Sequence, residues 1–191
     1  MLEAATPLVG KLLIAMPTLA DPNFWHTVVL VGVHSTDEGA FGLVINRPLE
    51  VELADILDEL GEAVPQSRFP QVLAGGPVEP NHGFVIYEKG DIELDETALH
   101  VNGEVTVSGS TETLANLARG DIESRYYLLL GYSGWYPGQL EREIEDNSWL
   151  VAPLDTSILF DTPLEERWTA ALRTIGVDPG TLVDVGAGDP S

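Results

Sequence analysis

The amino-acid sequence predicts an α+β fold, in which a single domain contains a mixed, curved β-sheet surrounded by about four helices. Three observations predict this class. Strand-like apolar runs outnumber helical patterns, they often follow one another without an intervening helix, and no linker-like change in composition divides the 191 residues. We therefore expect one domain over residues 1–191, with its core at about 10–176 and short polar ends.

Nine segments are expected to form strands, because they are rich in Val, Ile, Leu and Tyr and are bounded by Gly, Pro, Asn or Asp. Tight turns are expected at Asp37-Glu38-Gly39 and at Asn102-Gly103, and the second is a typical hairpin turn. The expected strands are Lys11–Met16, Thr27–His34, Phe41–Asn46, Gln71–Ala74, Gly83–Glu88, Glu104–Ser108, Arg125–Gly131, Trp149–Ala152 and Ser157–Phe160.

Four segments place apolar residues three and four positions apart, as on one face of a helix. Around one of them, Ser110 is a suitable N-cap and Gly120 a suitable left-handed residue after the last turn. The expected helices are Glu52–Leu60, Thr111–Arg119, Gly138–Asn147 and Pro163–Ile175.

Acidic side chains dominate the charge, since 31 Asp and Glu against 9 Lys and Arg give a formal net charge of −22. Direct binding to DNA requires clustered basic side chains, and here they are scattered singly, so the sequence disfavours nucleic acid as a partner. Two explanations of the acidity stay open. The acidic residues keep the protein soluble, as in a salty cytoplasm, or they form a docking face for a basic partner.

Other features narrow the compartment and the chemistry. The chain has no cysteine, which excludes disulfides and thiolate nucleophiles. Met1–Gly10 lacks the basic residues of a secretory signal, and the apolar stretch Leu12–Met16 is too short to span a membrane. We expect a cytoplasmic protein without membrane association, metal or cofactor. No metal-ligand spacing relates the four histidines, His26, His34, His82 and His100.

Two motifs superficially suggest catalysis or phosphate binding. Ser133 follows an apolar run, as in a hydrolase nucleophile elbow, but Trp135 stands where the elbow needs glycine. We expect Ser133 to be a turn residue. The Gly75-Gly76-Pro77 sequence lacks the lysine and the free amides of a phosphate loop, and a tight turn at a strand end is expected there.

The segment Gly138–Asn147 supplies the best candidate carboxylate. Leu140 and Ile144 share one helical face, which places Glu143 at its border and predicts a half-buried side chain. Glu143 is therefore either a catalytic acid or a hydrogen-bonded structural brace, whereas Glu141 is expected to be solvated. Because such a carboxylate needs a donor, we expect Arg47, in the loop Asn46-Arg47-Pro48, to point toward Glu143, Glu141 or Asp21.

Five segments in the same order resemble the YqgE/AlgH family: LLIAMPTLADPNFWHTVVLV, EGAFGLVINRP, LAGGPV with GFVIYE, GYSGWYPGQLEREIEDNSWL and ILFDTPLEERW. The resemblance covers about Gly10 to Gly176. It implies a bacterial, cytosolic, single-domain α+β protein whose curved sheet is partly barrel-like, and it implies no defined biochemical activity. One branch of the family carries the name of a transcriptional regulator of alginate synthesis. Two departures are Ser133, where the family commonly has Ala, and the absence of a terminal Gly-His-Ala.

The family motif, carried over residue by residue, supplies the candidates for a ligand- or partner-binding cleft. They are Met16, Asp21, Phe24, Asn46, Arg47, Gly75, Gly76, Trp135, Gln139, Glu143 and Asn147. We expect a non-enzymatic, regulatory module that binds a small ligand or a protein partner. The alternatives are a hydrolase or transferase that uses Glu143 or Asp21 with Arg47, and a regulator that binds DNA directly, which the charge disfavours. The sequence leaves the oligomeric state open.

Overall fold

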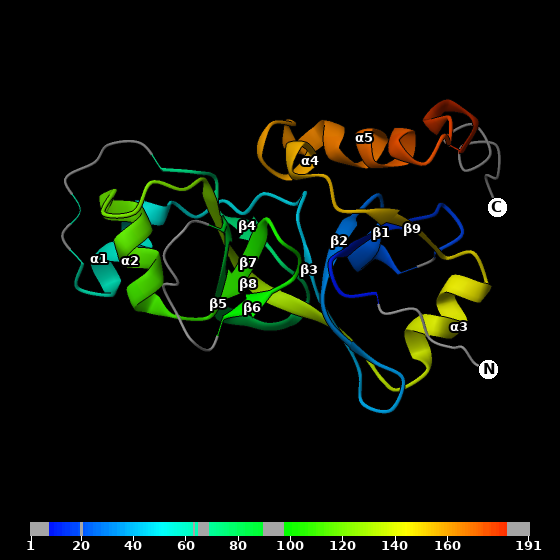
Figure 1. The fold of residues 1–191 in the computed structure, drawn as a ribbon, viewed down its shortest axis with the longest axis horizontal. Coiled ribbons are helices and arrows are strands. Elements are labelled where there is room, and N and C mark those ends of the chain that lie inside the picture. Colours follow the sequence, from blue (N-terminus) through cyan, green and yellow to red (C-terminus); the bar gives the residue numbers. More distant parts are fainter. Residues whose placement is uncertain (1–7, 20, 63, 65–68, 90–97, 183–191) are drawn as a thin grey trace.

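A single β-sheet organises the chain in the computed structural model, which describes residues 8–19, 21–62, 64, 69–89 and 98–182 (Figure 1). The sheet has nine strands in these residues: eight follow the order β6-β7-β5-β8-β3-β2-β1-β9, and the ninth, β4, pairs with β8 outside this path. The β4–β8 pair is parallel and the other pairs are antiparallel, so the expected mixed sheet is confirmed. The strands are β1 (Lys11–Ala15), β2 (Val28–Ser35), β3 (Gly39–Val44), β4 (Leu73–Ala74), β5 (Val78–Glu88), β6 (Leu99–His100), β7 (Val105–Ser108), β8 (Tyr126–Trp135) and β9 (Trp149–Pro153).

Strand β8 joins the two halves of the sheet. Its first part pairs with β5, from Tyr126 opposite Tyr87 to Leu130 opposite Gly83. Its last part pairs with β3, where Trp135 lies opposite Ala40. The strand therefore continues beyond the Gly131 end that the sequence predicts, and it carries Ser133 inside the sheet.

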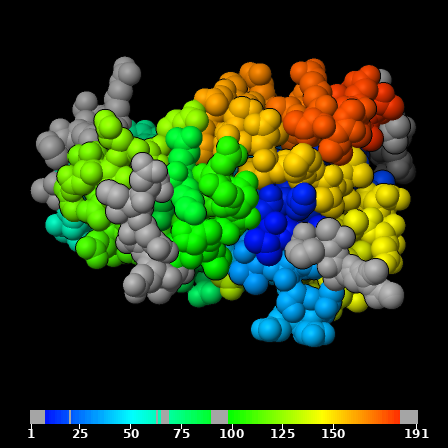
Figure 2. Space-filling view, viewed as in Figure 1, coloured from blue at the N-terminus to red at the C-terminus, as the bar shows by residue number. Residues whose placement is uncertain are grey.

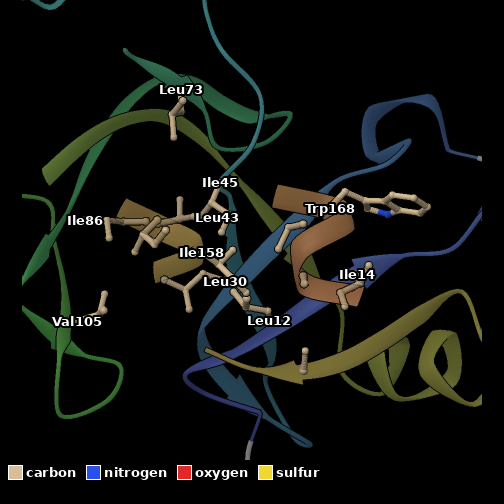
Figure 3. Packing of buried hydrophobic residues seen from close by; sticks show 14 of the residues in the cluster. Leu12, Ile14, Leu30, Leu43, Ile45, Leu73, Ile86, Val105, Ile158 and Trp168 are labelled. Carbon is tan, nitrogen blue, oxygen red and sulfur yellow. The ribbon is translucent and has the colours of Figure 1, made fainter. Parts of the chain in front are cut away.

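The sheet is curved and open, and its two faces bury different residues. Along β1, Leu12 and Ile14 enter the central core while Leu13 and Ala15 pack on the opposite face, as the two-residue period of a strand requires. The β6–β7 hairpin approaches the start of β1 so closely that a Cβ on Gly10 would lie 2.3 Å from the carbonyl oxygen of Val101. This curvature brings side chains of distant strands into one interior (Figure 3).

Helices cover three parts of the sheet (Figure 1). Helices α1 (Leu53–Glu59) and α2 (Thr111–Arg119) pack on β5 and β8 at one end, and α3 (Gln139–Glu145) packs on β1 and β9 at the other. Helices α4 (Thr156–Phe160) and α5 (Arg167–Thr174) bury Ile158 and Trp168 in the central core. In the space-filling view they form a ridge along one edge, and the β2–β3 hairpin projects from the opposite edge (Figure 2).

Most of the expected elements are confirmed within a few residues, and two segments differ in type or continuity. Ser157–Phe160 is helical rather than extended, because the Asp155 carboxylate accepts hydrogen bonds from the backbone and hydroxyl of Ser157 and caps α4. The segment Pro163–Ile175 is divided into the 3-10 turn η2 (Leu164–Glu166) and α5. The described residues form five α-helices and two 3-10 turns, where the sequence predicts about four helices. No helix within the described ranges has the length and apolarity to cross a membrane.

Candidate functional site

The loop between β1 and β2, which we call the β1–β2 loop, comprises residues 16–27 and is described except at position 20. Its 3-10 turn η1 (Pro22–Phe24) begins where the Asp21 carboxylate accepts a hydrogen bond from the backbone of Asn23 over 2.9 Å. Proline at the first position fixes a backbone angle that suits such a turn. The Asp21 side chain thus shapes the loop locally.

Asn46 and Arg47 hold one side of this loop through its backbone. The Asn46 amide donates to the carbonyl oxygen of His26 and accepts from the backbone N–H of Val28, both over 2.9 Å. Arg47 Nη2 donates to the carbonyl oxygen of Trp25 over 2.9 Å and approaches that of Pro22 at 3.4 Å. These contacts tie the end of β3 to the β1–β2 loop.

The expected pairing of Arg47 with a carboxylate is wrong. Arg47 forms no ion pair with any residue that the structure describes. Of the three acids considered, Glu143 and Glu141 receive hydrogen bonds from other side chains, and Asp21 caps η1. Carbonyl groups of an irregular loop also need donors, and the guanidinium supplies them here.

Glu143 braces the other side of the loop. Its Oε1 accepts hydrogen bonds from the indole nitrogens of Trp135 and Trp149, over 3.0 and 2.9 Å, and its Oε2 accepts one from Gln139 over 2.9 Å. The Phe24 ring packs against both indoles, with centroids 6.2 and 5.4 Å away. Glu143 is half-buried, as the sequence predicts, and both of its oxygens are engaged. The geometry is that of a structural brace.

Hydrogen bonds to backbone carbonyl groups also hold the β1–β2 loop on the side of Glu143. The N–H of Met16 donates to the carbonyl oxygen of Ser148 over 2.9 Å, and the Thr18 hydroxyl donates to that of Asn147 over 3.2 Å. Asn147 has a φ of 61°, a left-handed conformation that asparagine tolerates better than most residues. The chain can therefore leave α3 sharply and enter β9 beside the loop.

A stack of three rings, which sequence reasoning missed, lies at the end of the loop. The His26 ring stacks on Trp25 with centroids 3.7 Å apart and on Trp168 with centroids 4.1 Å apart. Trp25 stays 62% exposed, although large apolar side chains are usually buried. Burial lowers the pKa of His26, which favours the neutral imidazole. Two adjacent aromatic residues, Trp25 and His26, are a sequence signal for ring stacking, but no local pattern relates them to Trp168.

Arg167 supports the site from inside the protein, and the sequence did not single it out. It is 1% exposed and donates to the carbonyl oxygens of Ile45 and Thr162 and to the hydroxyl of Tyr127. Its guanidinium also lies 4.9 Å from the centre of the Tyr127 ring. Burial lowers the pKa of Arg167. Ile45 directly precedes Asn46 and Arg47, which hold the β1–β2 loop. The buried guanidinium of Arg167 therefore fixes the backbone next to these two residues.

Gly75 and Gly76 lie apart from the loop, where the chain between β4 and β5 crosses β8. A Cβ on Gly76 would lie 2.3 Å from the Tyr132 backbone, and a Cβ on Gly75 would lie 2.3 Å from the carbonyl oxygen of Gly131. Both glycines therefore allow two backbones to touch. Ser133 is buried in β8 rather than in a turn, and its hydroxyl donates to the carbonyl oxygen of Gly75 over 3.3 Å.

Two further observations concern acid–base and metal chemistry. His34 Nε2 lies 2.8 Å from Glu141 Oε2, so Glu141 is paired rather than freely solvated as expected. The backbone N–H of Leu8 donates to His34 Nδ1, which leaves Nε2 as the donor to Glu141.

In the described part of the chain, no three side chains of the metal-ligating types converge on one point.

The comparisons with known proteins agree with this architecture. Residues 12–180 match the AlgH-like family. A UPF0301 protein of Xanthomonas campestris is 42% identical over 181 residues, which cover 94% of this chain and 95% of that one. A UPF0301 protein of Paracoccus denitrificans is 41% identical, with 93% and 95% covered.

Two solved structures share the fold. The solution structure of the AlgH protein from Pseudomonas aeruginosa has a TM-score of 0.77 and 39% identity, and the match covers 100% of this chain and 99% of that one. A crystal structure of a Corynebacterium diphtheriae protein has a TM-score of 0.69 and 23% identity over 90% and 89% of the two chains, and this likeness concerns the fold alone. With the family match spanning nearly all of the described sheet and the β1–β2 loop, the chain belongs to the AlgH-like family.

Proposed function

We propose that this protein is a non-enzymatic binding module whose β1–β2 loop recognises a basic segment of a protein partner. The observation that carries the proposal is the exposed Trp25, displayed on a loop that side chains hold from both sides. Exposed tryptophans are enriched among residues that dominate protein–protein binding energy. A loop fixed before binding loses less conformational entropy when the partner arrives.

The charge of the surroundings supports a basic partner. Asp21 lies in the same loop, and the exposed Glu145 and Asp146 immediately precede Asn147, whose carbonyl oxygen accepts the Thr18 hydroxyl. A net charge of −22 attracts cationic segments over long distances, and an indole face binds Arg or Lys through cation–π contact. The same charge argues against direct contact with DNA, so we infer that a regulatory role, exerted in the cytoplasm, works through a protein.

Binding is better supported than catalysis. The enzymatic alternative uses Glu143 or Asp21 with Arg47, and each of these groups already has hydrogen-bond partners within the protein. A general base needs a free lone pair directed at substrate. The carboxylate of Glu143 instead satisfies two indole N–H groups that burial would otherwise leave without partners.

Site-specific photo-cross-linking tests the proposal. A benzoylphenylalanine replaces Trp25 in one variant and, in a matched control, the exposed Leu60, which directly follows α1 at the other end of the molecule (Figure 1). After irradiation in living cells, we expect one dominant adduct from position 25 that is absent from position 60. Mass spectrometry should place the contact in a Lys- or Arg-rich segment. Identical adducts at both positions, or a dominant contact with an acidic segment, would contradict the proposal.

A further inference from the structure

A concave pocket lies between α1, α2 and the sheet, at the end of the molecule away from the β1–β2 loop. It has a volume of about 340 Å³, within the range that small-molecule sites occupy. Its floor is apolar and comes from four elements: Ile56 from α1, Leu114 from α2, Val85 from β5, and Leu128 and Leu130 from β8. The exposed Leu60, which directly follows α1, lies at the rim. The mouth carries the polar groups of Asn81, Ser110 and Thr111 and the imidazole of His82, which stacks on the Phe84 ring.

Two of the residues that line the pocket, Gly83 and Gly109, have no side chain. A Cβ on Gly109 would meet no atom within 4 Å, and one on Gly83 would make ordinary contacts with Leu128 and Leu130, at 3.4 and 3.6 Å. An alanine at Gly83 would therefore narrow the pocket through ordinary apolar contact, whereas a Cβ on the exposed Gly109 would point into open space.

The lining of this pocket differs from the rest of the chain in its lack of acidic side chains and of Lys and Arg. Asp, Glu, Lys and Arg make up 21% of the chain, yet none of the described residues that line the pocket belongs to these types. The exposed Glu112 already places a negative charge in the first turn of α2, beside the mouth. Together with a net charge of −22, this carboxylate opposes the approach of an anion, and the lining residues that the structure describes offer no carboxylate to a cation.

We propose that the pocket binds a small, neutral, predominantly apolar molecule that carries a hydroxyl or carbonyl group. The apolar body would lie against Leu114, Leu128 and Leu130, and its polar group would face the polar groups at the mouth. This site is separate from the protein-binding surface proposed above, and it stands on different residues.

Matched aliphatic probes test both the location and the charge preference. Straight-chain alcohols and the carboxylates of equal chain length are titrated at pH 8 against isotope-labelled full-length protein, and the methyl signals of Leu114 and Leu128 are followed by NMR. We expect alcohol affinity to rise about fourfold per added CH₂ until the chain fills the pocket, from the transfer free energy of a methylene group. The carboxylates should bind at least tenfold more weakly. Equal binding of both series, or no shift at these methyl groups with any alcohol, would overturn the proposal.

Variants at the rim separate a specific site from general apolar association. Leu60→Glu adds a charge at a position that is 45% exposed, and Gly83→Ala fills part of the cavity at van der Waals distance. Each should weaken alcohol binding at least fivefold. Val51→Glu is the control, because Val51 is 38% exposed and lies outside this lining. Unchanged affinity in both pocket variants, or equal loss in the control, would refute the assignment.

Discussion

Arg47 Nη2 lies 2.9 Å from the carbonyl oxygen of Trp25, so a basic side chain shortly after β3 holds the backbone of the exposed tryptophan in the β1–β2 loop. The contact explains why an arginine is useful there without a carboxylate partner. A charged donor stabilises a carbonyl acceptor more strongly than a neutral one does. This hydrogen bond fixes the backbone of Trp25, so the exposed position of its indole follows from the fold.

Replacing Arg47 should loosen the loop. Arg47→Met keeps an unbranched apolar stem and removes the donors to Trp25 and Pro22, and we expect a loss of about 1–2 kcal/mol in the free energy of unfolding. Hydrogen exchange at the amides of residues 25–27 should accelerate. The control Arg173→Met changes an exposed side chain on α5 and should cost less than about 0.5 kcal/mol. Equal unfolding curves for both variants would show that the Arg47 contacts do not stabilise the loop.

Glu143→Ala should destabilise the protein more than a change at an exposed position of α3. It leaves the indole N–H groups of Trp135 and Trp149 without their acceptor, and each unsatisfied buried donor costs about 1–3 kcal/mol. Urea unfolding should therefore show a total loss of about 2–5 kcal/mol. Glu145→Ala, on the same helix but exposed, should change stability by less than about 0.5 kcal/mol. A stability loss for Glu143→Ala no larger than that of Glu145→Ala would contradict the brace.

Gly76→Ala should distort the crossing between β4 and β8. Gly76 has a φ of 155°, and the added methyl carbon would lie 2.3 Å from the carbonyl carbon and oxygen of Tyr132. Strain of this kind costs about 1–3 kcal/mol or more. Gly103→Ala, in the β6–β7 hairpin, meets no atom within 4 Å and should unfold at nearly the wild-type temperature. Calorimetry compares the two, and similar melting temperatures would show that the approach at Gly76 is not tight.

The pH dependence of stability should contain a contribution from His26. Its pKa lies below 6.5 because burial disfavours the imidazolium, so the unfolded chain takes up this proton first as the pH falls. The contribution of His26 to the free energy of unfolding is complete above about pH 6.5 and is lost as the pH falls below that value. Stability should decline less steeply in His26→Asn, which tolerates the φ of 54°. An NMR titration that gives a pKa above 6.5 would mean that attraction to the two indole rings exceeds the cost of burial.

The sequence predicted much of the fold because the relevant signals are local. The bounds of α2 are those expected, since Ser110 caps its first turn and Gly120 adopts the left-handed conformation after its last. The half-buried position of Glu143 follows from the period of one helix. The expectation that Ser133 lies in a turn failed because Gly131 bends the strand without ending it.

The partners of the site residues were less predictable, because they depend on pairings between distant segments. No local pattern shows that Trp135 and Trp149 share one carboxylate oxygen, or that Arg47 contacts carbonyl groups. The same holds for Trp168, which meets His26 only after α5 packs on β1 and β2. The structure brings nine of the eleven candidates together around the β1–β2 loop and places Gly75 and Gly76 elsewhere, and the partner expected for Arg47 was wrong.

We propose that the β1–β2 loop is a fixed platform that displays Trp25 before any partner binds. Backbone ¹⁵N relaxation of the wild-type protein measures this property directly. We expect order parameters of about 0.85 for residues 21–27, equal to those of β1 and β2. Values below about 0.6 across these residues would show a loop that moves freely in the unbound protein and would contradict the claim.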